Sequence, residues 1–151
     1  MGYNAISNGG NQENQWHTMS RDEWAYLLHV RNTASGIRFA RATVNGRLGI
    51  VVLPDHWKTS CYQLGCVNDI WSDFNSNIIP LSDWQRVLEP SGAVFLPEAG
   101  ARTIDGVFED ILVYHTSTAA TECAYLMQFG GIGAGAHRGD GLAVRLVRDV
   151  E

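Results

Sequence analysis

The stretch YHTSTAATECAYLMQFGGIGAGAHRGDGLAVRLV, residues 114–147, decides the fold of this chain. Its alternating segment 124–129 predicts a β-strand, because side chains along a strand point to opposite faces in turn. The core face is predicted to hold three bulky side chains, namely Tyr125, Met127 and Phe129. The opposite face then holds Leu126 and Gln128, which we expect to point outward.

The segments around this strand are predicted to complete one exposed surface. Residues 130–141 are rich in glycine and polar residues, which predicts a loop with tight backbone paths. Residues 142–147 predict a second apolar strand, with Val144 and Leu146 in the core. The run 115–118 supplies hydroxyl groups beside the central strand if the strands pair. We therefore expect the rest of the chain to be a scaffold for this C-terminal surface.

Composition predicts one domain over residues 1–151 and argues against two classes of partner. The chain has 151 residues, 45% of them hydrophobic, and a net charge of −5 without a basic stripe. Nucleic-acid binding is therefore not expected. No apolar run approaches the roughly 18 residues that span a membrane, so membrane insertion is not expected either. Residues 1–15 predict an irregular polar leader, and no signal peptide is visible there.

Two capping patterns predict two helices. Ser20 is followed three residues later by Glu23, a capping box that predicts a helix through about Arg31. Ser82 and Gln85 repeat the pattern and predict a short helix that ends by Glu89, before a proline.

Strand signals fill most of the remaining chain. Asn45-Gly46 predicts a tight hairpin between strands over 37–44 and 47–53. The apolar run 50–53 predicts a central strand covered on both faces, and residues 92–98 predict another strand. Asp105-Gly106 is a second hairpin signal. The connection 55–80 is predicted to be packed by its own aromatic side chains: Trp57, Tyr62, Trp71 and Phe74. Together these elements predict an α+β fold.

Six segments resemble, in order, a family of paralogous domains from Bacteroidetes and Fibrobacter. They are WHTMSRDEWAYLL, ATVNGRLGIVVLPDHW, GAVFLPEAGAR, YHTST, AYLMQF and GLAVRLV, between Trp16 and Val147. The family is similar to the C-type lectin-like fold shared by formylglycine-generating enzymes, and to the variable proteins that diversity-generating retroelements target. Two positions depart from its pattern: His115 replaces a tryptophan, and Leu142-Ala143 replace polar residues.

The resemblance implies a C-type lectin-like domain, with two helices packed on small antiparallel sheets and long loops. It implies a non-enzymatic ligand-binding function at the cell surface, outside the cell or on a virion. The ligand would be a protein or a glycan. In the variable proteins a C-terminal segment is hypermutated to form the binding surface, and residues 114–147 match that segment. The residues expected to bind are His115, Thr116, Thr118, Glu122, Leu126, Gln128, His137, Arg138 and Asp140.

Three alternatives stay open. The segment 130–141 can be an ordinary solvated hairpin loop, and the chain can be a structural module of a larger cell-surface or phage-tail protein. Cys61-x4-Cys66 invites comparison with the copper-binding cysteines of formylglycine-generating enzymes, although in that family the pair lies late in the chain. A catalytic His115 is not expected, because no orienting acid or nucleophile elbow accompanies it.

No cofactor or metal is expected either. The three cysteines are an odd number, and reduced, partly buried thiols are favoured over a Cys61–Cys66 bridge. The oxygen-rich segment 68–77 lacks the spacing of a calcium loop and predicts Asx turns instead.

Overall fold

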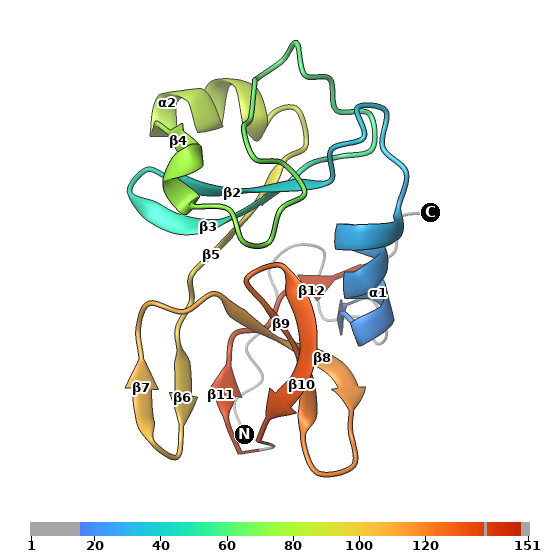
Figure 1. Cartoon of the computed structure of the whole chain (residues 1–151), viewed down its shortest axis with the longest axis vertical. Coiled ribbons are helices and arrows are strands. Elements are labelled where there is room, and N and C mark those ends of the chain that lie inside the picture. Colours follow the sequence, from blue (N-terminus) through green and yellow to red (C-terminus); the bar gives the residue numbers. More distant parts are fainter. Residues whose placement is uncertain (1–15, 138, 149–151) are drawn as a thin grey trace.

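The computed structural model describes residues 16–137 and 139–148 of an α+β protein. The predicted leader 1–15 and Arg138 therefore lie outside the described residues. Figure 1 shows two stacked parts: β2–β5 with α2 above, and β6–β11 below, with α1 beside them. In the described part of the chain, no helix is long and apolar enough to cross a membrane.

The upper sheet has the strand order β4-β2-β3-β5. The hairpin predicted around Asn45-Gly46 is confirmed, since β2 (Phe39–Val44) pairs with β3 (Arg47–Val52) and both turn residues have positive φ, 49° and 78°. β5 (Val94–Pro97) adds antiparallel to β3, and the short β4 (Ile78–Ile79) adds parallel to β2.

Both faces of this sheet are buried, as the apolar run 50–53 predicted. Ile50 and Val52 belong to one hydrophobic cluster, together with Trp24 of α1. Val51 and Leu53 belong to a second cluster on the other face. Alternate side chains of the run 50–53 therefore pack into two different cores on the two faces of the sheet.

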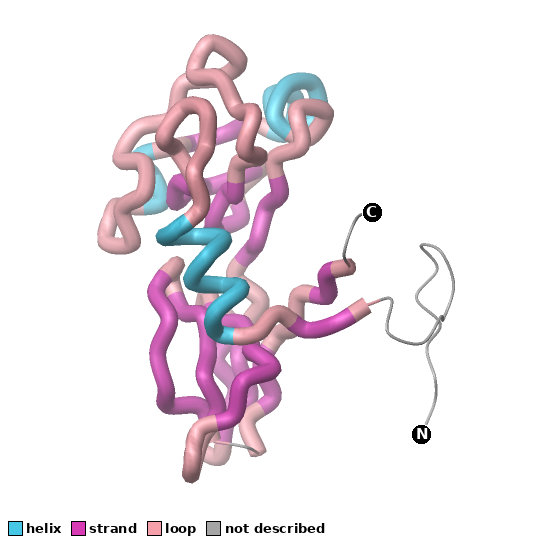
Figure 2. The backbone as a smooth tube through the Cα atoms, turned by 90° about the vertical axis from the view of Figure 1, so that its right-hand side faces the viewer, coloured by secondary structure: helices cyan, strands magenta, loops and turns pink. Residues whose placement is uncertain are grey.

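The first helix begins as its capping box predicts. α1 (Arg21–Ala25) continues into the π-helix η1 (Tyr26–Val30), and the Glu23 amide donates to Ser20 Oγ at 3.2 Å. The Ser20 amide donates in return to Glu23 Oε2 at 2.7 Å, and these bonds lower the pKa of the Glu23 carboxyl. α1 contacts β8, β9 and β10, and Figure 2 shows this helix crossing in front of the strands.

The second helix ends before Pro90 as predicted, but its predicted cap is wrong. α2 (Leu81–Asp83) and the π-helix η3 (Trp84–Leu88) follow Pro80, which is the N-cap and makes no side-chain capping bond. Pro80 has extended backbone (φ −63°, ψ 152°), so the helix begins two residues earlier than a cap at Ser82 requires. The Ser82 hydroxyl faces the Asp83 carboxylate instead.

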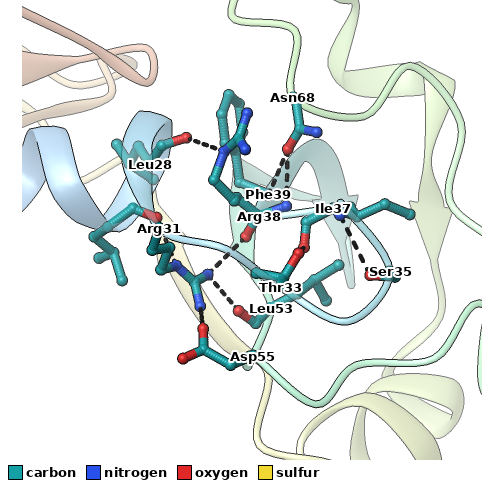
Figure 3. Close-up of polar contacts among 11 residues, drawn as sticks. Leu28, Arg31, Thr33, Ser35, Ile37, Arg38, Phe39, Leu53, Asp55 and Asn68 are labelled. Carbon is teal, nitrogen blue, oxygen red and sulfur yellow. Dashed lines mark hydrogen bonds and ion pairs between the residues drawn. The ribbon is translucent and has the colours of Figure 1, made fainter.

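Arg31 joins the end of the first helix to the upper sheet. Its guanidinium donates to the carbonyl oxygens of Leu27, Arg38 and Leu53 and forms an ion pair with Asp55. Figure 3 shows the guanidinium pointing between Arg38, Leu53 and Asp55. The Arg31 side chain is 7% exposed, whereas that of Asp55 is 67% exposed.

The long connection 55–80 is packed by its own side chains, with one exception. Trp57 and Tyr62 contact the second hydrophobic cluster and Phe74 contacts the first. Trp71 is 84% exposed, so its predicted packing is wrong. The predicted Asx turns are present: the Trp71 amide donates to Asp69 Oδ1 and the Asn75 amide to Asp73 Oδ1. The segment also holds the short 3-10 helix η2 (Phe74–Ser76).

The lower part consists of three small sheets. One has the order β10-β9-β8, formed by β8 (Val113–Ala119), β9 (Ala124–Gln128) and β10 (Gly131–Ala136). The second has the order β11-β6-β7, formed by β6 (Ala101–Thr103), β7 (Gly106–Phe108) and β11 (Gly141–Leu142). The third pairs β1 (His17–Thr18) with β12 (Leu146–Val147). The second predicted hairpin is therefore confirmed as β6–β7, although Thr103 pairs with Gly106, so its two turn residues are Ile104 and Asp105.

Two predictions for the C-terminal stretch are wrong. Residues 130–141 are not one loop, because β10 occupies the first half and pairs with β9. Phe129 and Gly130 have positive φ (52° and 92°), as in a two-residue type I′ turn that returns the chain directly. Residues 142–147 are not one strand: β11 and β12 belong to different sheets, and Val144 and Leu146 are exposed.

Candidate ligand-binding surface

The register of the β10-β9-β8 sheet, called the lower sheet from here on, places the predicted outward residues in adjacent rows. His115 pairs with Leu126, and Leu126 pairs with Gly133. The next row holds Gln128 opposite Gly131. Met127, between these rows in sequence, is fully buried on the other face, near α1. The predicted alternation of Leu126 and Gln128 against Met127 is therefore confirmed.

The other two residues expected on the core face have different surroundings. Tyr125 is half-buried and lies outside the hydrophobic clusters, with the Arg21 guanidinium 5.0 Å from its ring centre. Phe129 does pack against the first cluster, but from the turn after β9 and not from the strand. The predicted core face is therefore correct for Met127 and only partly correct for its neighbours.

A shallow depression of about 490 Å³ lies over the outward rows. Leu126 and Gln128 line it from β9, and glycines line it from β10. Trp71 and Ile70, from the long connection, complete the wall. A large exposed aromatic side chain beside a depression is typical of binding surfaces. The sequence does not mark Trp71 as a site residue, because aromatic residues in a long loop usually pack inward.

Arg41 holds the Trp71 segment against the lower sheet. Its Nη1 donates to the Ile70 carbonyl at 2.7 Å. Its guanidinium carbon is 3.9 Å from the ring centre of Phe74 and 5.6 Å from that of Phe129. Burial lowers the pKa of Arg41, although the nearby carboxylates of Asp73 and Asp69 oppose that effect. The Arg41 guanidinium therefore contacts both the turn after β9 and the backbone next to Trp71.

Two of the predicted binding hydroxyls have structural roles. Thr116 is buried, and its hydroxyl donates to the Tyr125 carbonyl at 3.0 Å and accepts from the Thr118 amide. The Thr116 hydroxyl is therefore engaged inside the protein, and ligand contact by this residue stays a prediction. Thr118 Oγ1 accepts from the Arg21 amide at 3.0 Å, at the start of α1. Both residues lie where the pairing of β8 with β9 shifts register. The Thr116 hydroxyl links the two strands there, and the Thr118 hydroxyl links β8 to α1.

Thr116→Val should lower the free energy of unfolding by about 1–2 kcal/mol, because a part-buried carbonyl and a part-buried amide lose their hydroxyl partner. The valine side chain has nearly the same shape, so packing is preserved. Urea unfolding measures the change. Ser117→Ala is the control at the exposed neighbouring position, and we expect it to change stability by less than about 0.5 kcal/mol. Equal effects of the two substitutions would contradict the structural role of the Thr116 hydroxyl.

The remaining predicted residues lie at the far end of the same sheet. Glu122 is exposed in the turn between β8 and β9. The His137 amide donates to Asp140 Oδ2 at 2.9 Å, and the Asp140 amide donates to the His137 carbonyl at 3.0 Å, which closes the turn after β10. In Figure 1 this turn, the β8–β9 turn and the β6–β7 tip lie at the lower end of the molecule.

His137 and Asp140 line a second hollow of about 440 Å³. Arg102, Thr103 and Ile104 complete it from the β6–β7 hairpin. These partners were missed because only the tertiary fold brings β6 beside the β10–β11 turn. The predicted residues thus form two groups, one over the sheet face and one at its lower end. Arg138 lies outside the described residues, so neither group is assigned to it.

The cysteines form no bridge. Cys61, Cys66 and Cys123 are all free, and the first two are exposed, not partly buried as expected. Over residues 16–137 and 139–148, no three or more histidine, cysteine or acidic side chains are grouped as a metal site would require.

Comparison with known proteins gives no match: neither a family model nor a curated protein nor a solved structure matches this chain. Two kinds of observation bear on the function of this chain. One is the geometry of the surface, and the other is the resemblance carried by the sequence motifs.

Proposed function

We propose that this protein is a non-catalytic ligand-binding domain of C-type lectin-like architecture, exposed on a cell or virion surface. The observation that carries the proposal is the outward face of β9 and β10, where Leu126 and Gln128 line one hollow with the exposed Trp71. His115 lies opposite Leu126 on the neighbouring strand β8. Binding depends on shape and hydrogen bonding on a rigid sheet.

The chemistry of this face suits a protein or glycan ligand. Trp71 and Leu126 offer apolar area, and an exposed indole can stack on a sugar ring or on an apolar side chain. The Gln128 amide can donate and accept hydrogen bonds, and the His115 imidazole can do both in its neutral form. A mainly apolar hollow with a few polar groups is the usual composition of a recognition site.

Side chains on this face can be exchanged, which changes the binding specificity, without a change of fold. Gln128 and Leu126 are held by backbone pairing to both neighbouring strands, so their positions do not depend on their own side-chain contacts. Substitutions there can alter the hollow while the ladder persists. This property agrees with the resemblance to retroelement-diversified proteins. A comparison of many sequences of the locus should find variation concentrated at these outward positions, whereas uniform drift would favour a structural module.

The double substitution Trp71→Ala/Gln128→Ala should weaken binding at least tenfold, because it removes the aromatic wall and the central amide. Two probes are used with the fluorescently labelled full chain: a glycan array and intact cells. The melting temperature should change by less than about 2 °C, since Trp71 is exposed and Gln128 contributes mainly its backbone to the sheet.

Tyr26→Ala is the matched control, because Tyr26 is an exposed aromatic residue on η1, outside this face. It should bind like the unmodified chain. If the double variant keeps full binding to every array spot and cell type that the unmodified chain recognises, the proposed face is wrong.

A second candidate function is a structural module of a larger assembly. It is favoured by the β6–β7 hairpin, which exposes three apolar side chains: Ile104, Val107 and Phe108. Exposed apolar groups of this kind often mark a contact with a neighbouring domain. For the formylglycine-generating-enzyme-like oxidase, a copper(I) titration is decisive, since stoichiometric binding lost on Cys61→Ser/Cys66→Ser would favour it over a binding domain.

A further inference from the structure

β10 is an open edge of the lower sheet. The strand order β10-β9-β8 leaves one of its sides without a neighbouring strand. Its sequence, Gly131–Ala136, contains no charged residue and no proline. Natural edge strands usually carry such residues to block pairing with another chain. The only protective feature here is a register shift between Ala134 and Ala136, at the far end of the strand.

Hairpin geometry tells which backbone groups face outward. Gln128 and Gly131 flank the two-residue turn, so they form the first hydrogen-bonded pair of the ladder. Pairs alternate, and the next hydrogen-bonded pair is Leu126 with Gly133. Ile132 and Ala134 therefore direct their N–H and C=O groups away from β9. No other residue in the described part of the chain hydrogen-bonds to them.

We propose that a second copy of this chain pairs with β10, antiparallel, about a two-fold axis at Gly133. In this register Ile132 lies opposite the partner's Ala134, and Ala134 lies opposite the partner's Ile132. Each pair exchanges two backbone hydrogen bonds, so all the outward groups of these residues are satisfied. Gly133 faces the partner's Gly133 at the close, non-hydrogen-bonded position, where neither residue has a side chain.

The reciprocity of this register favours a second copy over an unrelated strand. The same three residues satisfy one another when the strand meets itself, which is the condition for a two-fold interface. The strand is uncharged, so two copies meet without like-charge repulsion. A contact confined to short strands is small, and small interfaces are weak. We expect half of the chain to be dimeric at roughly 100 µM.

The dimer would add a second binding face to the proposed function. This part of the inference rests on the proposed function. A two-fold axis perpendicular to the sheet keeps both outer faces on the same side. The two three-stranded sheets then form one continuous sheet with two copies of the face that carries Leu126 and Gln128. A ligand with repeated epitopes could engage both copies, and avidity would exceed the affinity of either one.

Ala134→Pro tests the edge pairing with little effect on the fold. Proline removes the Ala134 N–H, which faces away from β9, and edge strands tolerate proline at such positions. Ala134→Val is the matched control, because it adds side-chain bulk but keeps the N–H. Sedimentation equilibrium of the full chain from about 5 µM to 1 mM should show a dimer for the unmodified chain and for Ala134→Val. Ala134→Pro should weaken it at least tenfold.

Two outcomes of this experiment overturn the dimer. An unmodified chain that is monomeric at 1 mM overturns it, and so does a dimer that Ala134→Pro leaves intact. Should the proline variant unfold, hydrogen exchange of the unmodified chain decides: Ile132 and Ala134 amides that exchange equally fast at low and high concentration exclude the pairing.

Binding and pairing fail independently in this design. The ligand assays are made near 0.1 µM, where the chain is monomeric, so loss of the dimer leaves the Trp71 and Gln128 result unaffected. A monomeric chain whose ligand binding is abolished by Ala134→Pro, but not by Ala134→Val, would assign the edge to an extended segment of the ligand. That result overturns the dimer and leaves the proposed function standing.

Discussion

Arg31→Ala should lower the free energy of unfolding by about 3–4 kcal/mol, one of the two largest effects expected for a single substitution in this chain. The buried guanidinium satisfies three carbonyl oxygens that no alanine can reach, those of Leu27, Arg38 and Leu53. These carbonyls come from the first turn of η1, the residue before β2 and the residue after β3. Their simultaneous loss should separate α1 from the upper sheet. Urea or thermal unfolding measures the change.

The ion-pair partner of Arg31 supplies the control. Asp55 is two-thirds exposed, and water can replace its contact. Asp55→Asn should therefore cost less than about 1 kcal/mol. Arg31→Lys should have an intermediate effect, because an ammonium cannot donate to all these carbonyls in a fixed fork. A loss below about 1 kcal/mol for Arg31→Ala would contradict the role of these carbonyl bonds.

Gly49→Ala should destabilise the chain by about 3 kcal/mol through backbone crowding. A methyl group at Gly49 would lie 2.4 Å from the Leu96 carbonyl oxygen and 2.6 Å from the Phe95 ring. Both neighbours belong to β5, and the carbonyl is part of the backbone, so β5 has to move. The φ of Gly49 is not in the left-handed region, so crowding alone is responsible.

Gly65→Ala is the matched glycine control. A methyl group there meets its nearest atom, the Ser76 carbonyl oxygen, at 3.7 Å, which is ordinary contact. We expect a change within about 0.5 kcal/mol. Equal melting temperatures for the two alanine variants would contradict the close approach of β3 to β5.

Local signals predicted much of the fold. The capping box at Ser20 and Glu23 and the turn at Asn45-Gly46 are decided by neighbours in sequence, and both are present. The apolar run 50–53 predicted a strand covered twice because each alternate residue requires its own core. Such elements need no knowledge of distant contacts.

Predictions failed where distant contacts decide. β10 reads as a loop because glycine favours no strand by itself, but pairing with β9 and the turn at Phe129-Gly130 form one. Pro80 preorganises the start of α2 and displaces the cap expected at Ser82. Trp71 is exposed because its neighbours, and not its own ring, anchor the loop through Arg41.

The residues of the candidate site show the same difference between local signals and distant contacts. Alternation along β9 correctly predicted the outward side chains of Leu126 and Gln128, since it follows from strand geometry alone. The burial of Thr116 was not predicted, because it lies at a register shift that no local signal marks. Arg102 and Trp71 come from other elements, so only the folded chain places them beside the predicted residues.

The most direct test of the binding face is an NMR titration of the labelled full chain with the glycan or surface protein that the array and cell experiments return. The account predicts that the Trp71 indole N–H, the Gln128 side-chain amide and the backbone amides of Leu126 and Gly133 shift together and saturate with one affinity. Signals of Tyr26 and of α2 should stay unchanged. Saturable shifts confined to α2, η3 or the β6–β7 hairpin, with these four signals unmoved, would contradict it.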